Sequence, residues 1–143
     1  MTVKEYLSQA WAWQQAIQRK RKHLAVLKCL ADDTAGRISD MPRASSPNPQ
    51  RMEDVLIKVV DLEREIAEDE KAMYEARQRV ASMIAELSDT GQMQVLMKRY
   101  LEYKGWMQIQ QELGVGERWV HRLHQRAVEA LEKIFAKSLE FVE

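Results

Sequence analysis

The segment LMKRYLEYKGWMQIQQELGVGERWVHRLHQRAVEAL, from Leu96 to Leu131, decides the fold of this chain. Within it, apolar residues recur every three or four positions on both sides of the short segment LGVG, which is the spacing of amphipathic helices. The aligned positions are Trp106, Ile109 and Leu113 before the turn and Val120, Leu123, Ala127, Leu131 and Ile134 after it. A short helix, a glycine-containing turn and a second helix make up a helix-turn-helix motif. We therefore expect this motif, with a further helix over MQVLMKRYLEY in front of it.

The second helix of the motif has a polar face at its N-terminal end. At about 100° per residue, the side chains opposite or flanking the apolar stripe are Glu117, Arg118, His121, Arg122, Gln125 and Arg126. A recognition helix inserts this end into the major groove of DNA, where Arg can bridge guanine and Gln can bridge adenine. Lys98, Arg99 and Lys104, in front of the motif, are candidates for holding phosphates without reading sequence. The plainer alternative is a solvated, charged face of a surface helix.

All three prolines fall within DMPRASSPNPQ, residues 40–50, where serine and asparagine also concentrate. This composition is typical of a linker, which we place at residues 36–50. The segments on either side, residues 2–31 and 51–90, contain neither glycine nor proline and are therefore competent to form long helices. The N-terminal part of the chain, residues 1–88, is predicted to consist of these two helices and the linker.

Each long segment carries one apolar stripe with alternating steps of three and four residues, as in a coiled coil, interrupted once by a charge, Lys20 in one and Asp69 in the other. Residues 1–31 hold six basic side chains against one acidic, whereas residues 50–88 hold ten acidic against six basic. Opposite charges favour pairing of the two helices as an antiparallel hairpin. In one register Lys20 lies opposite Asp69, and we expect this pair to set the register, because a lone buried charge is costly. The alternative is that each side chain reaches water separately.

The overall composition limits the classes of function. The 22 basic and 22 acidic side chains cancel, so the net charge does not point to a nucleic-acid partner. The single cysteine, Cys29, excludes an intramolecular disulfide. No signal peptide or apolar run of membrane-spanning length is visible, so we expect a cytoplasmic protein without membrane contact. No catalytic cluster, metal set or phosphate loop is apparent, so we expect neither an enzyme nor a cofactor.

The segment from Leu96 to Leu131 resembles region 4 of bacterial sigma factors, in the version found in phage regulators similar to the ArpU and RinA late-transcription activators. The shared positions are Arg99-Tyr100-Leu101, Trp106, Ile109, Glu112-Leu113-Gly114, Val120, Leu123, Ala127 and Leu131. The upstream segment SSPNPQRMEDVLIKVVDLEREI is similar to the middle of an uncharacterised phage and prophage family. The resemblance implies a phage or prophage origin and base contacts from Glu117, Arg118, His121 and Arg122.

Two departures limit what the resemblance carries over. Gly105 and Gly116 stand where the sigma-like proteins usually have a Ser or Thr helix cap, which costs only a few tenths of a kcal/mol for glycine. The N-terminal helices have no counterpart to the sigma regions that open promoters and grip the polymerase core. We therefore do not expect a complete sigma factor.

Together these patterns predict an all-α protein with a long antiparallel hairpin over residues 1–88 and a sigma region 4-like helix-turn-helix domain over 89–143. The expected function is sequence-specific binding of double-stranded DNA by a phage-type transcriptional regulator. A homodimer would suit paired half-sites, and the hairpin is a candidate contact with a second subunit or with bacterial RNA polymerase. One alternative is a DNA-binding packaging or replication protein. Another is a protein-interaction module that binds polymerase or an anti-sigma-like partner.

Overall fold

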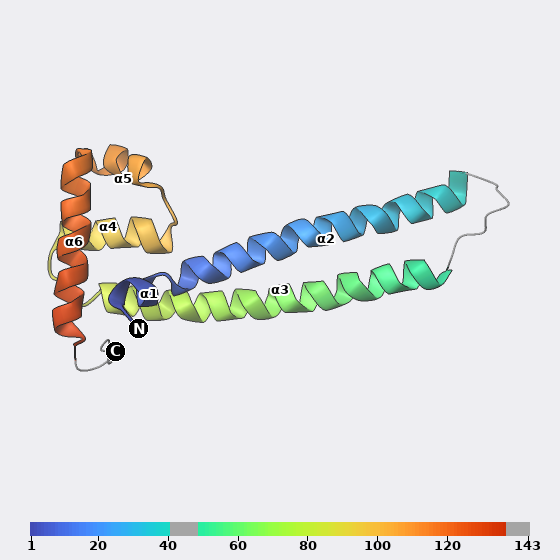
Figure 1. The fold of residues 1–143 in the computed structure, drawn as a ribbon, viewed down its shortest axis with the longest axis horizontal. Coiled ribbons are helices and arrows are strands. Elements are labelled where there is room, and N and C mark those ends of the chain that lie inside the picture. The colour runs from blue at the N-terminus through green and yellow to red at the C-terminus, as the bar shows by residue number, and fades with distance from the viewer. Residues whose placement is uncertain (41–48, 137–143) are drawn as a thin grey trace. The chain divides into compact units, whose positions relative to one another are not determined.

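The secondary structure of the described residues consists of helices joined by short connections. The computed structural model describes the backbone of residues 1–40 and 49–136 and the side chains of residues 1–32 and 50–136. Its elements are α1 (Val3–Leu7), α2 (Gln9–Asp40), α3 (Pro49–Ile84), α4 (Thr90–Leu96), the π-helix η1 (Met97–Leu101), α5 (Trp106–Leu113) and α6 (Glu117–Ile134) (Figure 1). These ranges contain no strand, which confirms the all-α class. None of the described helices is both long and apolar enough to cross a bilayer.

The helices next to the predicted linker are longer than the sequence suggested. α2 continues to Asp40 and α3 begins at Pro49, so both ends of the expected linker 36–50 are helical. Proline is tolerated at the start of a helix, because its missing N–H would have no helical partner there. The rest of the expected linker, residues 41–48, lies outside the described residues.

The chain forms two compact units. One consists of Met1–Trp13 together with Ala72–Glu143, and the other consists of Gln14–Lys71. This division does not follow the boundary at residues 88 and 89 that we expected from the sequence. The physical reason is a shared core, in which Val3 and Leu7 of α1 and Val80 and Ile84 of α3 pack with residues of α4, η1 and α6. The end of α3 therefore belongs with the C-terminal helices.

In the Gln14–Lys71 unit, α2 and α3 are joined by ion pairs whose partners progress in opposite directions along the two helices. Lys28 Nζ lies 3.3 Å from Glu63 Oε2, and Arg21 pairs with Glu70. Lys20 Nζ donates to Asp69 Oδ2 at 2.7 Å and also lies 3.4 Å from Glu65 Oε1.

Lys20 and Asp69 therefore lie together as the heptad pattern indicated. Asp69 is buried, with 8 % of its surface exposed, whereas the lysine is only partly covered. The hydrogen bond to Asp69 is the largest cause of a raised pKa for the Lys20 ammonium, which keeps it charged. That this pair sets the register of the two helices stays a prediction.

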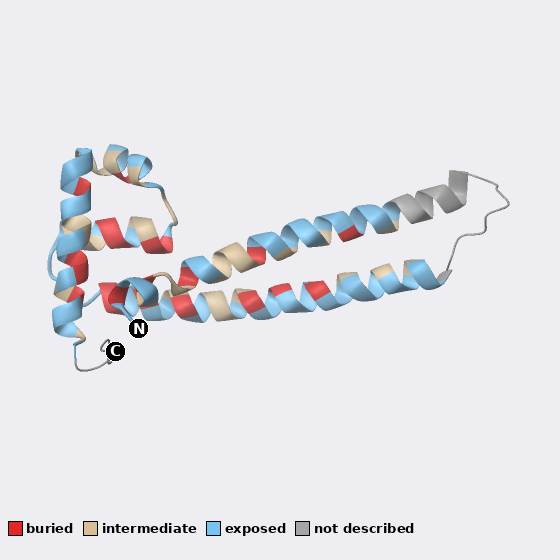
Figure 2. Cartoon of the chain, viewed as in Figure 1, coloured by how far each residue is buried: buried red, intermediate tan, exposed pale blue. Residues whose placement is uncertain are grey.

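The described residues of the other unit form two hydrophobic cores, which appear as buried segments on α3, α4 and α6 in Figure 2. The larger core joins α1, the end of α3, α4 and η1 to the C-terminal half of α6, where Ala127, Val128 and Leu131 are buried. The smaller core is built on Val95 of α4, Ile109 of α5 and Val120 of α6, all fully buried. Together the two cores hold α6 along most of its length.

The connection between α5 and α6 consists of Gly114, Val115 and Gly116. Gly114 caps α5 in the left-handed conformation, at φ 67°, which glycine adopts without a steric penalty. Gly116 precedes α6 with extended backbone and no side-chain cap, and Gly105 does the same for α5. The expected pattern of helix, short turn and helix over this stretch is thus present in the backbone.

The helix in front of this stretch departs from the sequence expectation at both ends. It begins at Thr90 rather than Met93, because the Asp89 carboxylate accepts a hydrogen bond from the Gln92 amide at 2.9 Å. It then widens into the π-helix η1 and ends at Leu101, so Tyr103 lies outside it with φ at 60°. The extra residue of a π-turn shifts the buried face, which is why Tyr100 and Leu101 are both buried.

Candidate nucleic-acid interface

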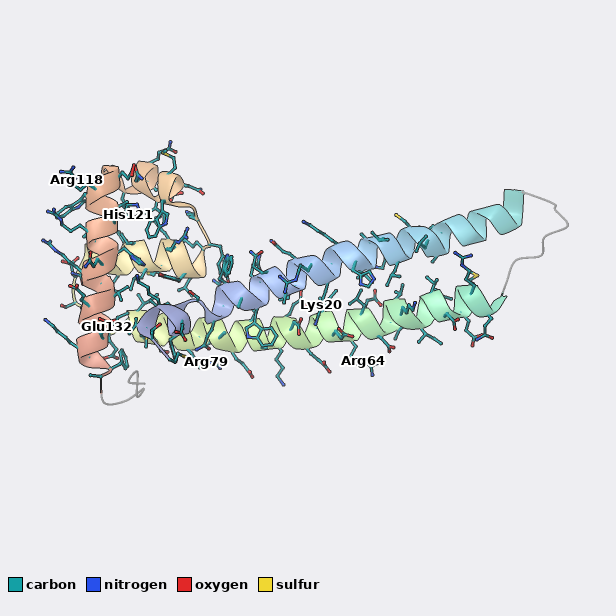
Figure 3. All side chains as sticks on the ribbon, in the orientation of Figure 1. Lys20, Arg64, Arg79, Arg118, His121 and Glu132 are labelled. Carbon is teal, nitrogen blue, oxygen red and sulfur yellow. The ribbon has the colours of Figure 1, made fainter. Side chains whose placement is uncertain are left out.

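α6 presents an exposed polar face along its first turns. Val120 is buried against Val95 and Ile109, and this contact orients the helix so that its opposite side faces solvent. The side chains expected to contact DNA are all exposed: Glu117, Arg118, His121, Arg122, Gln125 and Arg126. Figure 3 shows Arg118 on the outer side of α6 and His121 on the side nearer α5. The helical periodicity therefore predicted the exposure of these residues correctly.

The arginines of this face have few partners within the protein. Neither Arg118 nor Arg122 forms an ion pair or side-chain hydrogen bond among the described residues. The Arg126 guanidinium lies 5.6 Å from the centre of the Trp119 ring, a cation–π contact, and Trp119 is itself 42 % exposed. A cation without an internal partner can take an anionic ligand at no cost in broken contacts.

His121 and His124 both pack on Trp106, whose ring centre lies 4.7 Å from that of His121 and 5.0 Å from that of His124. His124 also lies 2.7 Å from the Tyr100 hydroxyl through Nε2. Burial lowers the pKa of His124 to about 4, helped by the charges of Lys4, Arg99 and His121. Burial likewise raises the pKa of Tyr100. At neutral pH this is a contact between an uncharged imidazole and an uncharged phenol.

Lys98 and Lys104, expected to hold phosphates, are instead engaged with Glu112 of α5. Lys98 Nζ lies 2.6 Å from Glu112 Oε1, and Lys104 Nζ lies 2.7 and 2.9 Å from the two oxygens of the same carboxylate. Lys104 also pairs with Glu102 at 2.8 Å. The hydrogen bonds from Lys104 and then Lys98 lower the pKa of Glu112 to about 2, and those to Glu102 and Glu112 raise the pKa of Lys104.

Arg99 is also held within the protein. Its guanidinium lies 4.6 Å from the centre of the Trp106 ring and donates to the Lys104 carbonyl at 3.2 Å. Together with Lys98 and Lys104 it connects η1, the following loop and α5. Each of these three cations therefore has an internal partner in η1, the following loop or α5, and phosphate contact by them stays a prediction.

Sequence reasoning did not identify Glu112 or Tyr100 as partners of charged or polar groups. Both residues were named only as positions shared with the sigma-like pattern. Their partners lie 8 to 24 positions away, across a loop, where no helical periodicity applies. The sequence did show an acidic residue near two lysines, but nearness in the sequence does not specify which of these side chains meet.

A protein-family model matches most of this chain. The family described as "Protein of unknown function (DUF1492)" matches residues 38–132. The chain belongs to the DUF1492 family. The DUF1492 match extends from the end of α2 through most of α6 and so includes the candidate interface and the smaller core, but not the α1 residues of the larger core. No curated protein and no solved structure matches the chain at a significant level.

Proposed function

We propose that this protein binds double-stranded DNA through α5 and α6, which act as a helix-turn-helix, and that α6 is the recognition helix. The support is the arrangement of two helices around a three-residue connection, with the polar side of α6 exposed. The resemblance of Leu96–Leu131 to sigma region 4 supports the same role. On that resemblance we assign the protein to phage-type transcriptional regulation.

One observation carries the proposal: Arg118 and Arg122 are exposed one turn apart on α6 and have no internal partner among the described residues. Residues i and i+4 lie on one side of a helix, so both guanidiniums are available to one groove. His121 and Gln125 add hydrogen-bonding groups at the same spacing. Arg can contact phosphates or the edge of guanine, so this face combines affinity with sequence reading.

The test is DNA binding by the full chain as a function of salt. Fluorescence anisotropy with duplexes selected from a random pool would give the dissociation constant at several salt concentrations. Binding should weaken as salt rises, because bound phosphates release counterions. Arg122→Ala should weaken binding about tenfold or more at fixed salt, since one lost base or phosphate contact is worth about 1–3 kcal/mol.

The matched control is Arg64→Ala, which removes another exposed arginine, from the Gln14–Lys71 unit. It should leave DNA affinity and its salt dependence unchanged. If no duplex is enriched and Arg122→Ala has no effect, the DNA-binding function is wrong.

A second candidate function is docking on a protein such as RNA polymerase or an anti-sigma-like partner. It is favoured by large apolar side chains that α5 and α6 leave exposed, Met107 at 67 % and Trp119 at 42 %. Such residues are enriched in protein interfaces. Binding that is lost with Trp119→Ala but is insensitive to salt and to Arg122→Ala would favour this candidate over DNA.

We further propose that α2 and α3 form an antiparallel hairpin that mediates self-association, as paired half-sites would require. Its support is a set of exposed apolar side chains in the Gln14–Lys71 unit: Val26, Leu56, Ile57 and Val60. Light scattering should give twice the monomer mass, and Val60→Glu should return the monomer. A monomer at all concentrations would leave polymerase contact as the role of the hairpin.

A further inference from the structure

A cleft of about 530 Å³ lies within the Met1–Trp13 and Ala72–Glu143 unit, separate from the exposed arginines of α6. Most of its wall is aromatic. The rings come from Trp11 of α2, Tyr100 of η1, Tyr103 of the following loop, Trp106 of α5 and His124 of α6. Clefts of this size with aromatic walls and a few polar groups are typical of small-molecule sites. This feature plays no part in the proposed DNA contact.

The backbone is irregular at the point where it lines this cleft. η1 is the one π-helix of the described chain, and it contributes Arg99 and Tyr100 to the wall. Tyr103 is the one non-glycine residue there with a positive φ, at 60°. Such a conformation is unfavourable for an aromatic residue, and π-turns and strained residues occur often at ligand sites.

Contacts from α3 hold the strained segment in place. Arg77 donates through Nη1 to the Leu101 carbonyl at 2.5 Å and to the Tyr103 hydroxyl at 3.3 Å. Its guanidinium also lies 5.7 Å from the centre of the Tyr103 ring. These contacts hold the part of the cleft wall that Tyr103 contributes.

The charge within the cleft is positive. Lys4 and Arg99 line it, no carboxylate does, and His124 is uncharged because burial lowers its pKa to about 4. The Lys4 ammonium has no ion pair or side-chain hydrogen bond among the described residues. Arg99 lies over the Trp106 ring, and Trp11 is 48 % exposed. The cleft thus pairs one available cation with an accessible aromatic surface.

We propose that this cleft binds a small molecule that combines a planar aromatic ring with an anionic group, of which a nucleoside monophosphate is the representative class. The ring would stack against the exposed Trp11 indole, since Arg99 and His121 already pack on the Trp106 ring. The phosphate or carboxylate would lie at Lys4, the cation of the cleft that has no ion pair or side-chain hydrogen bond among the described residues. Aromatic stacking and a charge-assisted contact together select for molecules with both features over those with one.

The experiment is isothermal titration calorimetry of the full chain with five probes: AMP, GMP, indole-3-acetate, adenosine and inorganic phosphate. AMP or GMP should bind with 1:1 stoichiometry and saturate below about 1 mM. Adenosine and phosphate, which each lack one of the two features, should bind at least about tenfold more weakly. Saturation by indole-3-acetate in place of the nucleotides would assign the ligand to the aromatic carboxylates.

Two single substitutions test the location. Trp11→Ala removes an exposed part of the aromatic wall and Lys4→Gln removes the available cation, and each should weaken binding about tenfold. Trp119→Ala is the matched control, because this exposed indole lies outside the cleft. Thermal melts would show whether the variants are folded. If Trp11→Ala does not fold, Lys4→Gln alone tests the location of the site.

The proposal is overturned if none of the aromatic anions saturates, if phosphate alone binds as well as the nucleotides, or if Trp11→Ala and Lys4→Gln both leave binding unchanged. Because none of these substitutions touches Arg118 or Arg122, failure here leaves the DNA-binding proposal untouched. Loss of DNA binding would likewise not affect the ligand result.

Discussion

Two groups of basic residues lie close together in the sequence and differ in what surrounds them. Lys98, Arg99 and Lys104, in and after η1, are all engaged, two with the Glu112 carboxylate and one with Trp106 and a carbonyl. Arg118 and Arg122 on α6 have no such partners among the described residues. A basic residue near a helix-turn-helix is therefore not in itself a DNA contact. Only a cation without an internal partner is free to neutralise a phosphate at no structural cost.

The largest expected effect separates the two groups directly. Replacing both Arg118 and Arg122 by alanine should weaken DNA binding about 100-fold or more and lower the salt slope by about 2. Replacing both Lys98 and Lys104 by alanine should leave the salt slope unchanged, because these lysines already neutralise carboxylates. Anisotropy titrations at several salt concentrations measure both. Equal losses of slope would contradict the distinction drawn between the groups.

The next prediction concerns the inner side of α6, which faces η1 and where His124 contacts Tyr100. It is a dependence of stability on pH. Because the pKa of His124 is about 4 in the folded chain and about 6.5 when unfolded, the unfolded state binds the proton first as the pH falls. Stability from the neutral ring is present above pH 6.5 and is lost towards pH 4. Allowing for partial exposure, we expect about 1–2 kcal/mol of this loss.

Urea denaturation at pH 7 and pH 4.5 measures this effect. His124→Gln, which cannot take up the proton, should show a smaller loss over the same range. An identical pH dependence in the two proteins would mean that the ring is not held neutral.

Substitutions in the turn between α5 and α6 should have a smaller effect, on the free energy of unfolding. Gly114→Ala should lower the free energy of unfolding by about 1 kcal/mol, because φ is 67° at this position. Gly116→Ser is the matched change two residues later, where the backbone is extended and the cap is missing. It should raise the free energy by about 0.3 kcal/mol. Chemical denaturation curves check both signs, and destabilisation by Gly116→Ser would contradict the assigned cap position.

The smallest effect concerns the Glu112 carboxylate. Its pKa is lowered to about 2, so the stability that it contributes is present above its ordinary value near 4.5 and lost as the pH falls towards 2. Glu112→Gln should remove this part of the acid sensitivity and leave Lys98 and Lys104 without a shared partner. Melting temperatures between pH 5 and pH 2 measure it, with Glu129→Gln on the exposed side of α6 as the control. No difference between Glu112→Gln and the parent would show that solvent screens the contact fully.

The periodic features of the helices could be predicted from the sequence. Apolar residues three and four positions apart indicated that Val120 and Ile109 would be buried, and that Arg118 and Arg122 would be exposed. The same stepping placed Lys20 opposite Asp69. These inferences succeed because a regular helix relates neighbouring positions by a fixed angle, so that a short segment specifies its own faces.

At the end of η1 the same rule fails, because Tyr103 lies outside the helix. The π-turn adds a residue to one turn of helix, and a positive φ at Tyr103 redirects the chain, although no local preference of tyrosine favours that conformation. Along this segment the spacing does not determine which side chains meet.

The sequence by itself determined the approximate positions of the long helices and which side of α6 faces solvent, since both depend on contacts between near neighbours in the chain. Only the tertiary structure decided that Glu112 neutralises Lys98 and Lys104, that His124 is buried beside Tyr100, and that Trp11 and Trp106 share a cleft. The physical reason is that ion pairs and ring contacts between distant residues depend on the path of the loops. A single irregular turn is enough to change those partners.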